Sequence, residues 1–190
     1  MTDAFTVLKA DHTEVETLLT RLLGGPGPVS GASRDPAGDA EQLVVAESGH
    51  EAAEELYFWP AVRQRVAGGA DLADEALRQE REGKRVLDRL RRSRPGDADF
   101  DRLVTAFAAA GRAHIAYEED QVWPKLRAVL GDGEAEEMGE RLASARAAGP
   151  TRPHPAAPDG PAGLKTAGTA AAVLDRLRDA VIGRPRSRRW

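Results

Sequence analysis

Two histidine–glutamate pairs have the spacing of metal ligands. His50 and Glu54 are four residues apart, and so are His114 and Glu118. On a helix this spacing places both side chains on one face, one turn apart. A neutral imidazole and a carboxylate that point to the same place bind iron, manganese or zinc. Two helices that each carry such a pair would together supply four ligands.

The two pairs belong to a longer internal repeat. When His50 is set against His114, seven positions are identical in the fourteen-residue segments HEAAEELYFWPAVR and HIAYEEDQVWPKLR. A weaker echo aligns the segment that begins at Asp11 with the segment that begins at Gln79. The order along the chain is therefore A-B-A′-B′, which predicts two helical hairpins related by a pseudo-twofold axis.

Two more polar residues fall where the apolar pattern calls for leucine. His12 and Glu80 lie on the core-facing stripes of the two remaining helices, and they are opposite each other in the weaker repeat. A polar side chain in a core costs free energy unless it is paired or binds a metal. The candidate ligands come from all four helices: His12, His50, Glu54, Glu80, His114 and Glu118.

The symmetry of the repeat suggests an assignment of these ligands to two ions. We expect His12 and His50 to bind one ion, and Glu80 and His114 to bind the other. The two motif glutamates would bridge the ions, as in other carboxylate-bridged centres of helical bundles.

Apolar residues three and four apart predict the helices that must position these side chains. Four long helices are expected, at residues 2–23, 39–66, 72–92 and 100–130. Pro60 and Pro124 should kink two of them at equivalent positions. Loops between neighbouring helices favour an all-α, antiparallel up-down four-helix bundle over residues 1–133. A short helix and a Pro/Gly/Ala-rich linker should follow at 134–163, and a short amphipathic helix with a basic tail at 164–190, as a flexible C-terminal extension.

Composition restricts the classes of protein that fit this chain. Charged residues make up 31% and hydrophobic residues 41% of it, and it contains no cysteine, which excludes disulfides and thiolate metal sites. No apolar run approaches the roughly 20 residues that span a bilayer, and the first residues lack the pattern of a secretion signal. We expect a cytoplasmic protein without a membrane partner. A net charge of −4 does not favour nucleic acid, although the arginine-rich tail is a candidate contact for a protein partner.

Three segments resemble the hemerythrin-like (HHE cation-binding) family in its bacterial, actinobacterial form. They are KADHTEVETLL, SGHEAAEELYFWPAV and AHIAYEEDQVWPKL, and the likeness covers residues 1–130. The resemblance implies a non-haem di-iron centre that binds dioxygen, peroxide or nitric oxide, with a role in sensing or handling these molecules or iron. The ligand types leave manganese and zinc open.

The chain departs from the family pattern at Glu80, where a third histidine is expected. An additional carboxylate should stabilise ferric iron and lower its reduction potential. That disfavours a reversible dioxygen carrier and favours a redox sensor, or catalase-like or ferroxidase chemistry. Two other interpretations stay open: that Glu80 does not bind and one metal position is weak, or that it points into solvent. The alternative function is an interaction or scaffold bundle with a degenerate metal site.

Four other glutamates lie close to the motifs. Glu51, Glu55 and Glu119 are expected on a solvated face, with Glu55 and Glu119 also in reach as hydrogen-bond acceptors for ligand histidines. Glu47 lies one turn before His50 on the inner stripe and is a further candidate carboxylate.

Overall fold

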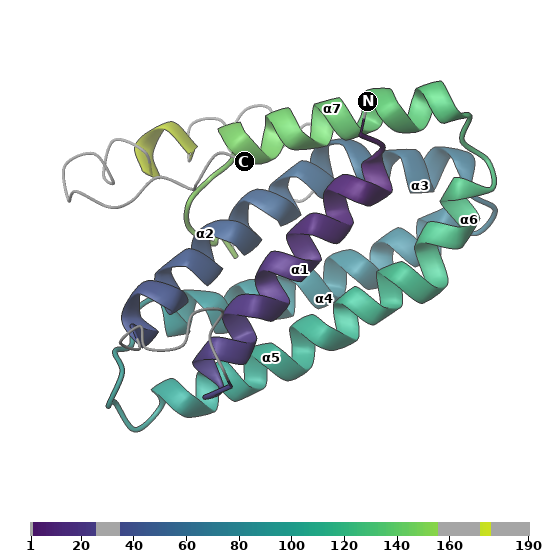
Figure 1. Cartoon of the computed structure of the whole chain (residues 1–190). Coiled ribbons are helices and arrows are strands. Elements are labelled where there is room, and N and C mark those ends of the chain that lie inside the picture. Colours follow the sequence, from purple (N-terminus) through teal and green to yellow (C-terminus); the bar gives the residue numbers. More distant parts are fainter. Residues whose placement is uncertain (1, 26–34, 156–171, 176–190) are drawn as a thin grey trace.

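The chain folds into an all-helical bundle. The computed structural model describes residues 2–25, 35–155 and 172–175, and this part of the chain contains no strand. The main elements are α1 (Ala4–Leu22), α2 (Pro36–Ala53), η1 (Glu54–Phe58), α3 (Trp59–Arg65), α4 (Gly69–Leu90), α5 (Phe100–Tyr117), η2 (Glu118–Val122), α6 (Trp123–Arg127) and α7 (Asp132–Ala148). Because α2, η1 and α3 follow one another without a break, as do α5, η2 and α6, they form two of the four long helices of the bundle (Figure 1).

Local chemistry explains where these helices begin. The Asp3 carboxylate accepts a hydrogen bond from the Thr6 backbone N–H at 2.7 Å, and the Asp35 carboxylate accepts one from the Gly38 N–H at 2.9 Å. Both are helix N-caps, which satisfy donors that have no partner inside the helix. Gly68 precedes α4 with a φ of 72°, a left-handed conformation that glycine adopts at little cost. The four predicted helices are confirmed, with bounds that differ by no more than three residues.

The bundle interior consists of two apolar clusters. One contains Leu8 together with Phe58 and Trp59, and the other contains Val15 together with residues of α2, α4 and α5. His12 lies between Leu8 and Val15 in α1 and belongs to neither cluster. His50 in α2 and Glu80 in α4 likewise lie between members of the two clusters along their helices. Glu54 lies beside His50, and Glu118 lies beside His12 and His114, so the bundle has a polar layer across its middle.

The two long helices that carry the His-x-x-x-Glu motifs change their winding directly at the motif glutamate. The Trp59 N–H bonds to the Glu54 carbonyl and the Trp123 N–H to the Glu118 carbonyl, five residues back, which is the pattern of a π-helix. The next residue in each helix is a proline, which has no N–H to donate. At the positions where kinks are expected from the sequence, the structure therefore has π-helical turns, a feature frequent at functional sites.

A fifth helix packs against this bundle. α7 lies against α1, α2 and η1, and Figure 1 shows it running along the side of the molecule near the N-terminus. The helix expected at 134–147 is thus present as Asp132–Ala148. Of the predicted C-terminal extension, only residues 149–155 and a helical turn at 172–175 are described; residues 156–171 and the basic tail lie outside the described residues. In the part of the chain that is described, no helix is long and apolar enough to cross a membrane.

Candidate metal centre

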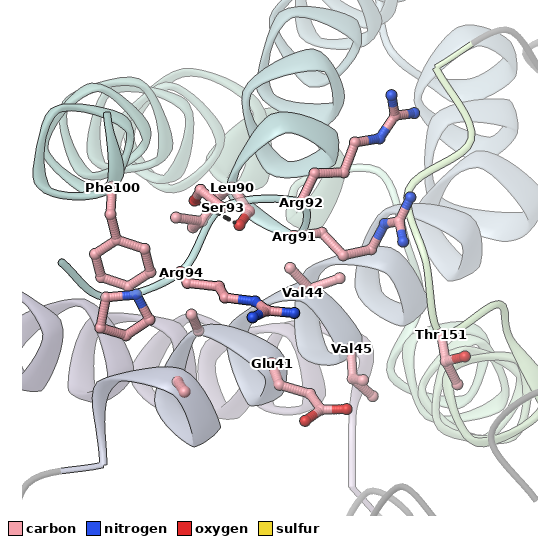
Figure 2. Close-up of a pocket in the computed structure, with 13 residues that line it drawn as sticks. Glu41, Val44, Val45, Leu90, Arg91, Arg92, Ser93, Arg94, Phe100 and Thr151 are labelled. Atoms are coloured by element: carbon pink, nitrogen blue, oxygen red, sulfur yellow. Dashed lines mark hydrogen bonds between the residues drawn. The ribbon is translucent and has the colours of Figure 1, made fainter. Parts of the chain in front are cut away.

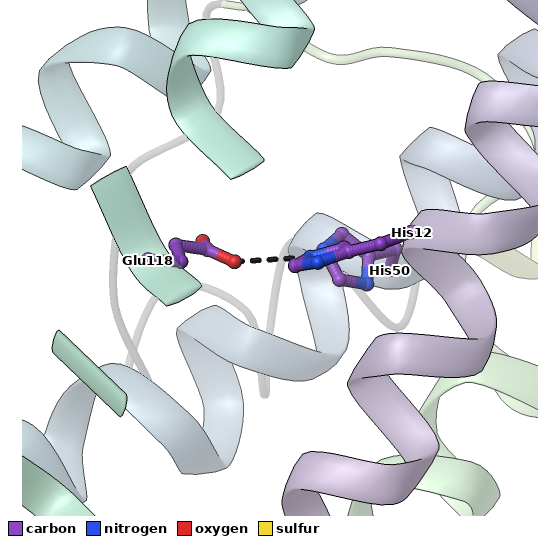
Figure 3. A group of neighbouring side chains, drawn as sticks. All are labelled: His12, His50 and Glu118. Atoms are coloured by element: carbon purple, nitrogen blue, oxygen red, sulfur yellow. Dashed lines mark ion pairs between the residues drawn. The ribbon is translucent and has the colours of Figure 1, made fainter. Parts of the chain in front are cut away.

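Histidine and glutamate side chains meet in the polar layer as two overlapping groups. Ligand atoms of His12, His50 and Glu118 lie within 4.8 Å of one another, and so do those of Glu54, His114 and Glu118. Figure 3 shows His12 and His50 side by side, facing the carboxylate of Glu118. Because Glu118 belongs to both groups, the two groups form one continuous site.

The shared carboxylate presents one oxygen to each side of the site. Glu118 Oε2 lies 3.1 Å from His12 Nε2, and Glu118 Oε1 lies 3.0 Å from His114 Nε2. Glu54 Oε2 lies 3.3 Å from His50 Nε2. The side chains of both glutamates are 0% exposed. This is the geometry of a carboxylate placed between two positions that each have an imidazole nitrogen.

The inward atoms of the site have no hydrogen-bond partner among the described residues. They are His12 Nε2, His114 Nε2 and both carboxylate oxygens of Glu54 and Glu118. Buried polar atoms without a partner cost roughly 1–3 kcal/mol each, and charged ones cost more. A divalent cation supplies what these atoms lack, since imidazole nitrogens and carboxylate oxygens are its usual ligands. The donor set therefore fits a metal.

Each histidine is held by its other ring nitrogen. Each Nδ1 atom contacts a side-chain oxygen. His12 Nδ1 is 2.8 Å from Glu119 Oε1, His50 Nδ1 is 3.3 Å from Asp11 Oδ2, and His114 Nδ1 is 3.0 Å from Gln79 Oε1. An Nδ1–H that donates to such an oxygen leaves Nε2 as the free lone pair. All three imidazoles are thus oriented with Nε2 toward the centre.

Charge in the site changes the proton affinities of its members. Burial alone would raise the pKa of Glu118, but the neighbouring His114 and His12 outweigh it and lower the pKa of this carboxyl strongly. Burial lowers the pKa of His114, yet the charge of Glu118 more than offsets this and raises it to about 9. Burial, and then the charges of Glu118 and Glu80, raise the pKa of Glu54 well above its usual value. Without a cation, the site is therefore held by imidazolium–carboxylate attraction.

Glu80, the sixth candidate, lies next to this centre but has other partners. The Trp59 indole N–H donates to Glu80 Oε1 at 2.6 Å, and Lys84 Nζ is 3.7 Å from Glu80 Oε2. The side chain is 2% exposed, so the interpretation in which it points into solvent is wrong. Glu80 belongs to neither group of converging ligand atoms. Its role as a metal ligand stays a prediction.

Lys84 explains why two glutamates predicted on a solvated face are buried. Glu55 forms an ion pair with the Lys84 ammonium, which also lies 3.8 Å from Glu51 Oε2. Glu51 and Glu55 are 4% and 3% exposed, so the prediction was wrong for both. The carboxylates around Lys84 raise the pKa of that ammonium despite its burial, which keeps it charged. A buried cation makes the burial of several anions tolerable.

Three residues that position the site were not singled out from the sequence. Asp11 and Gln79 contact ligand histidines, and Arg146 of α7 forms a 2.7 Å ion pair with Asp11 Oδ1. The sequence contained a weak indication of Asp11 and Gln79, because each directly precedes a candidate ligand and the two are aligned in the weaker repeat. Arg146 had no such signal. Glu119, by contrast, was a candidate hydrogen-bond acceptor for a ligand histidine, and it accepts from His12.

A separate cavity lies at the C-terminal end of α4. It has a volume of about 340 Å³ between α2 and the α4–α5 turn, and Figure 2 shows Arg91, Arg92 and Arg94 around it. None of the six candidate ligands lines this cavity.

The fourth histidine, His154, does not take part in the metal centre. Its Nε2 is 3.0 Å from Asp175 Oδ2, and it belongs to neither group of ligand atoms.

Comparison with known proteins agrees with this geometry. Residues 3–126 match the family model of the hemerythrin HHE cation binding domain. An uncharacterized hemerythrin-like protein of Schizosaccharomyces pombe is 25% identical over 139 residues, which cover 73% of this chain and 68% of that protein. The crystal structure of a hemerythrin HHE cation binding domain-containing protein from Mycobacterium kansasii has a similar fold. Its TM-score is 0.64 at 22% identity, over 92% of this chain and 99% of that one.

The family match spans both His-x-x-x-Glu motifs and every residue of the two ligand groups. The resemblance noted in the sequence is confirmed, as is the helical bundle it implied. This chain belongs to the hemerythrin HHE cation-binding family, and its bundle is a hemerythrin-like cation-binding domain.

Proposed function

We propose that this chain is a non-haem di-metal protein that holds two iron ions in its polar layer. One position would use His12, His50 and Glu118, and the other would use Glu54, His114 and Glu118. The observation that carries this proposal is the shared Glu118 carboxylate, fully buried, with one oxygen near an imidazole on each side and no hydrogen bond to either oxygen. A bridging carboxylate has this placement in di-iron bundles.

This assignment is narrower than the one the sequence suggested. Ligand atoms of Glu54 converge with those of His114 and Glu118, so we assign Glu54 to that position. Because its Oε2 is also 3.3 Å from His50 Nε2, Glu54 is a second candidate bridge beside Glu118. Glu80 is not required, because its oxygens face Trp59 and Lys84. Each position then has three protein ligands, which leaves coordination places for a small molecule.

Iron in such a site supplies redox chemistry with dioxygen, peroxide or nitric oxide, and we propose sensing or handling of one of these, or of iron itself, as the function. The chain contributes by holding three imidazoles through their Nδ1 atoms and by keeping the layer between two apolar clusters. The Lys9 ammonium lies 2.6 Å from Glu119, which in turn holds His12, so a charged contact links the protein surface to the site.

The direct test is elemental analysis with a visible spectrum of protein produced in iron-rich medium. We expect two irons per chain and an absorption band typical of bridged di-iron sites. Glu118→Gln should lose most of the iron because both positions share this carboxylate. Glu82→Gln, which replaces an exposed carboxylate paired with Arg78, should retain it. Iron-free wild-type protein, or full iron content in the Glu118 variant, would refute the proposal.

A second candidate is an interaction or scaffold bundle with a degenerate metal site. The observation in its favour is Glu80, which stands where the family pattern has histidine and contacts protein groups instead. This candidate predicts that His50→Ala and His114→Ala barely change stability in the presence of iron. Under the di-metal proposal, the same variants should abolish the stabilisation that added iron gives to the wild-type chain.

Consumption of peroxide or oxidation of ferrous iron above the rate of free iron would extend the di-metal proposal to a catalase-like or ferroxidase enzyme.

A further inference from the structure

Glu47 is a buried carboxylate with no partner. It lies in α2 and its side chain belongs to the buried polar residues, with 8% exposure. No hydrogen bond or ion pair connects Glu47 to any described residue, although other buried glutamates in this region, such as Glu51, Glu55 and Glu80, all have the Lys84 ammonium nearby. The Glu47 oxygens are not among the fully buried atoms that lack a hydrogen bond, so this carboxylate keeps a little contact with solvent. A largely buried carboxylate without a protein partner is still costly.

The position of Glu47 in α2 directs it to the metal centre. Glu47, His50 and Glu54 are separated by three and four residues, so they share one face of the helix. Burial raises the pKa of Glu47, and the charges that oppose this rise are those of His50, His114 and His12. The three imidazoles of the proposed centre are thus the positive groups that lower the pKa of this carboxyl against the effect of burial. The acids around the same layer are Asp11, Glu51, Glu54, Glu80 and Glu118.

Glu80, the residue expected to supply a third carboxylate, is occupied elsewhere. Its Oε1 accepts from Trp59 at 2.6 Å and its Oε2 faces Lys84. To bind a metal, Glu80 would have to give up the indole N–H, which would leave that donor buried and unpaired. Glu47 has no bond to break. Like Glu80, it belongs to neither group of converging ligand atoms, so binding requires a change of its side-chain rotamer.

We propose that Glu47 is a metal ligand of this centre and supplies the carboxylate that the sequence pattern assigned to Glu80. This inference rests on the proposed di-metal function. It gives the centre three carboxylates and three imidazoles, a donor set that favours iron or manganese over softer metals. It also assigns Glu80 to a structural role, in which it fixes Trp59 and Lys84 beside the centre.

A matched pair of variants tests this assignment. Glu47→Gln and Glu80→Gln each replace a buried carboxylate by an amide of the same size on neighbouring helices. Full-length protein is stripped of metal and titrated with ferrous iron under argon against a competing chelator, which gives the stoichiometry and affinity of binding. Thermal unfolding of the metal-free forms gives the structural effect of each change.

We expect Glu47→Gln to weaken the binding of at least one iron by about 10- to 100-fold, the range known for changes around metal ligands. Metal-free Glu47→Gln should be no less stable than the wild type, because it removes an uncompensated charge. Glu80→Gln should keep wild-type iron affinity and lose stability. Should Glu47→Gln fail to fold, Glu47→Asp serves instead and should bind iron more weakly than wild type while keeping the carboxylate.

Other outcomes would overturn the inference. Wild-type affinity in Glu47→Gln would show that the residue is only a buried acid, and weakened binding in Glu80→Gln alone would return the role to Glu80. In both cases the wild-type chain still binds two irons, so the proposed function survives. A wild-type chain that binds no iron would instead refute the proposed function together with this ligand.

Discussion

Acidic residues in the interior of this bundle are stabilised in three different ways. Glu118 lies between two imidazoles, and Glu51, Glu55 and Glu80 share the ammonium of Lys84. Glu54 has an imidazole nearby but no hydrogen bond. Glu47 has neither a hydrogen bond nor an ion pair with the described residues. Since a buried charge needs compensation, the acids without an ammonium or a hydrogen bond are the ones that a bound cation would stabilise. The acids around Lys84 are thus compensated by an ammonium, whereas Glu118 and Glu54 adjoin the imidazoles of the proposed centre.

The two repeat-related tryptophans give a test of this distinction. Trp59→Phe should lower the free energy of unfolding by about 1–3 kcal/mol, because it leaves Glu80 Oε1 buried without its donor. Trp123→Phe should cost less, since the Trp123 N–H has no partner and its stacking on His12 is retained by a phenyl ring. Urea unfolding of the metal-free proteins measures both.

A lost packing contact must be separated from the lost hydrogen bond. In a Glu80→Leu background no acceptor remains, so Trp59→Phe should cost clearly less there than in the wild type. An equal cost in both backgrounds would mean that the indole–carboxylate bond does not stabilise the protein.

Ligand types could be read from the sequence, but their partners could not. The spacing of His50 with Glu54 and of His114 with Glu118 is local, so a helix period was enough to place each pair on one face. The pairing of Glu55 with Lys84 joins residues 29 positions apart on two helices. Helix periodicity does not determine which residues of different helices meet, and the burial of Glu55 was therefore missed.

At the level of elements, α7 connects to the centre although it carries no ligand. Arg146 holds Asp11, and Asp11 contacts the Nδ1 of His50. The sequence predicted this helix but treated it as part of a region outside the bundle. Its weak apolar stripe gave little indication that it packs on α1 and α2, and that contact depends on small residues that permit close approach.

Gly139 is the position where this close approach can be tested. A Cβ on Gly139 would be 2.8 Å from the Asp3 carbonyl carbon and 3.0 Å from the Ala4 nitrogen, both rigid backbone atoms. Gly139→Ala should therefore destabilise the protein by about 1–3 kcal/mol through overpacking, and it should loosen α7. Limited proteolysis and thermal unfolding report the two effects.

Gly133 in the first turn of the same helix is the matched control. A Cβ there meets nothing within 4 Å, so Gly133→Ala should be neutral or stabilise the helix by up to about 1 kcal/mol. Equal effects of the two substitutions would show that the contact between α7 and the N-terminal segment does not contribute to stability.

The whole molecule combines two apolar clusters with a charged layer between them. Periodicity predicted an apolar stripe on each helix, and the polar residues on those stripes predicted a set of ligands that converge from four helices. What the sequence left undetermined was the distribution of charge within the layer. That distribution, a net excess of carboxylates over imidazoles and one lysine, makes the stability of the metal-free protein depend on pH.

The stability of the metal-free protein should fall as the pH rises, while the stabilisation that bound metal adds should grow. The pKa of His114 is raised from 6.5 to about 9 by Glu118 despite burial, so its stabilisation is complete below pH 6.5 and is lost as the pH rises toward 9. The raised pKa values of Glu54 and Glu80 act in the same direction, because their ionisation in the fold is unfavourable. Metal binding needs His114 and Glu54 deprotonated, so metal affinity rises over the same range. The melting temperature of metal-free protein should fall between pH 6.5 and 9, while the increase in melting temperature caused by iron or manganese should grow.

Glu118→Gln is the control for this prediction. It lacks the charge that raises the His114 pKa, and its metal-free melting temperature should change less with pH. A flat profile for the wild type, or a metal effect that shrinks toward pH 9, would mean that the imidazoles and carboxylates of the layer do not exchange protons for metal.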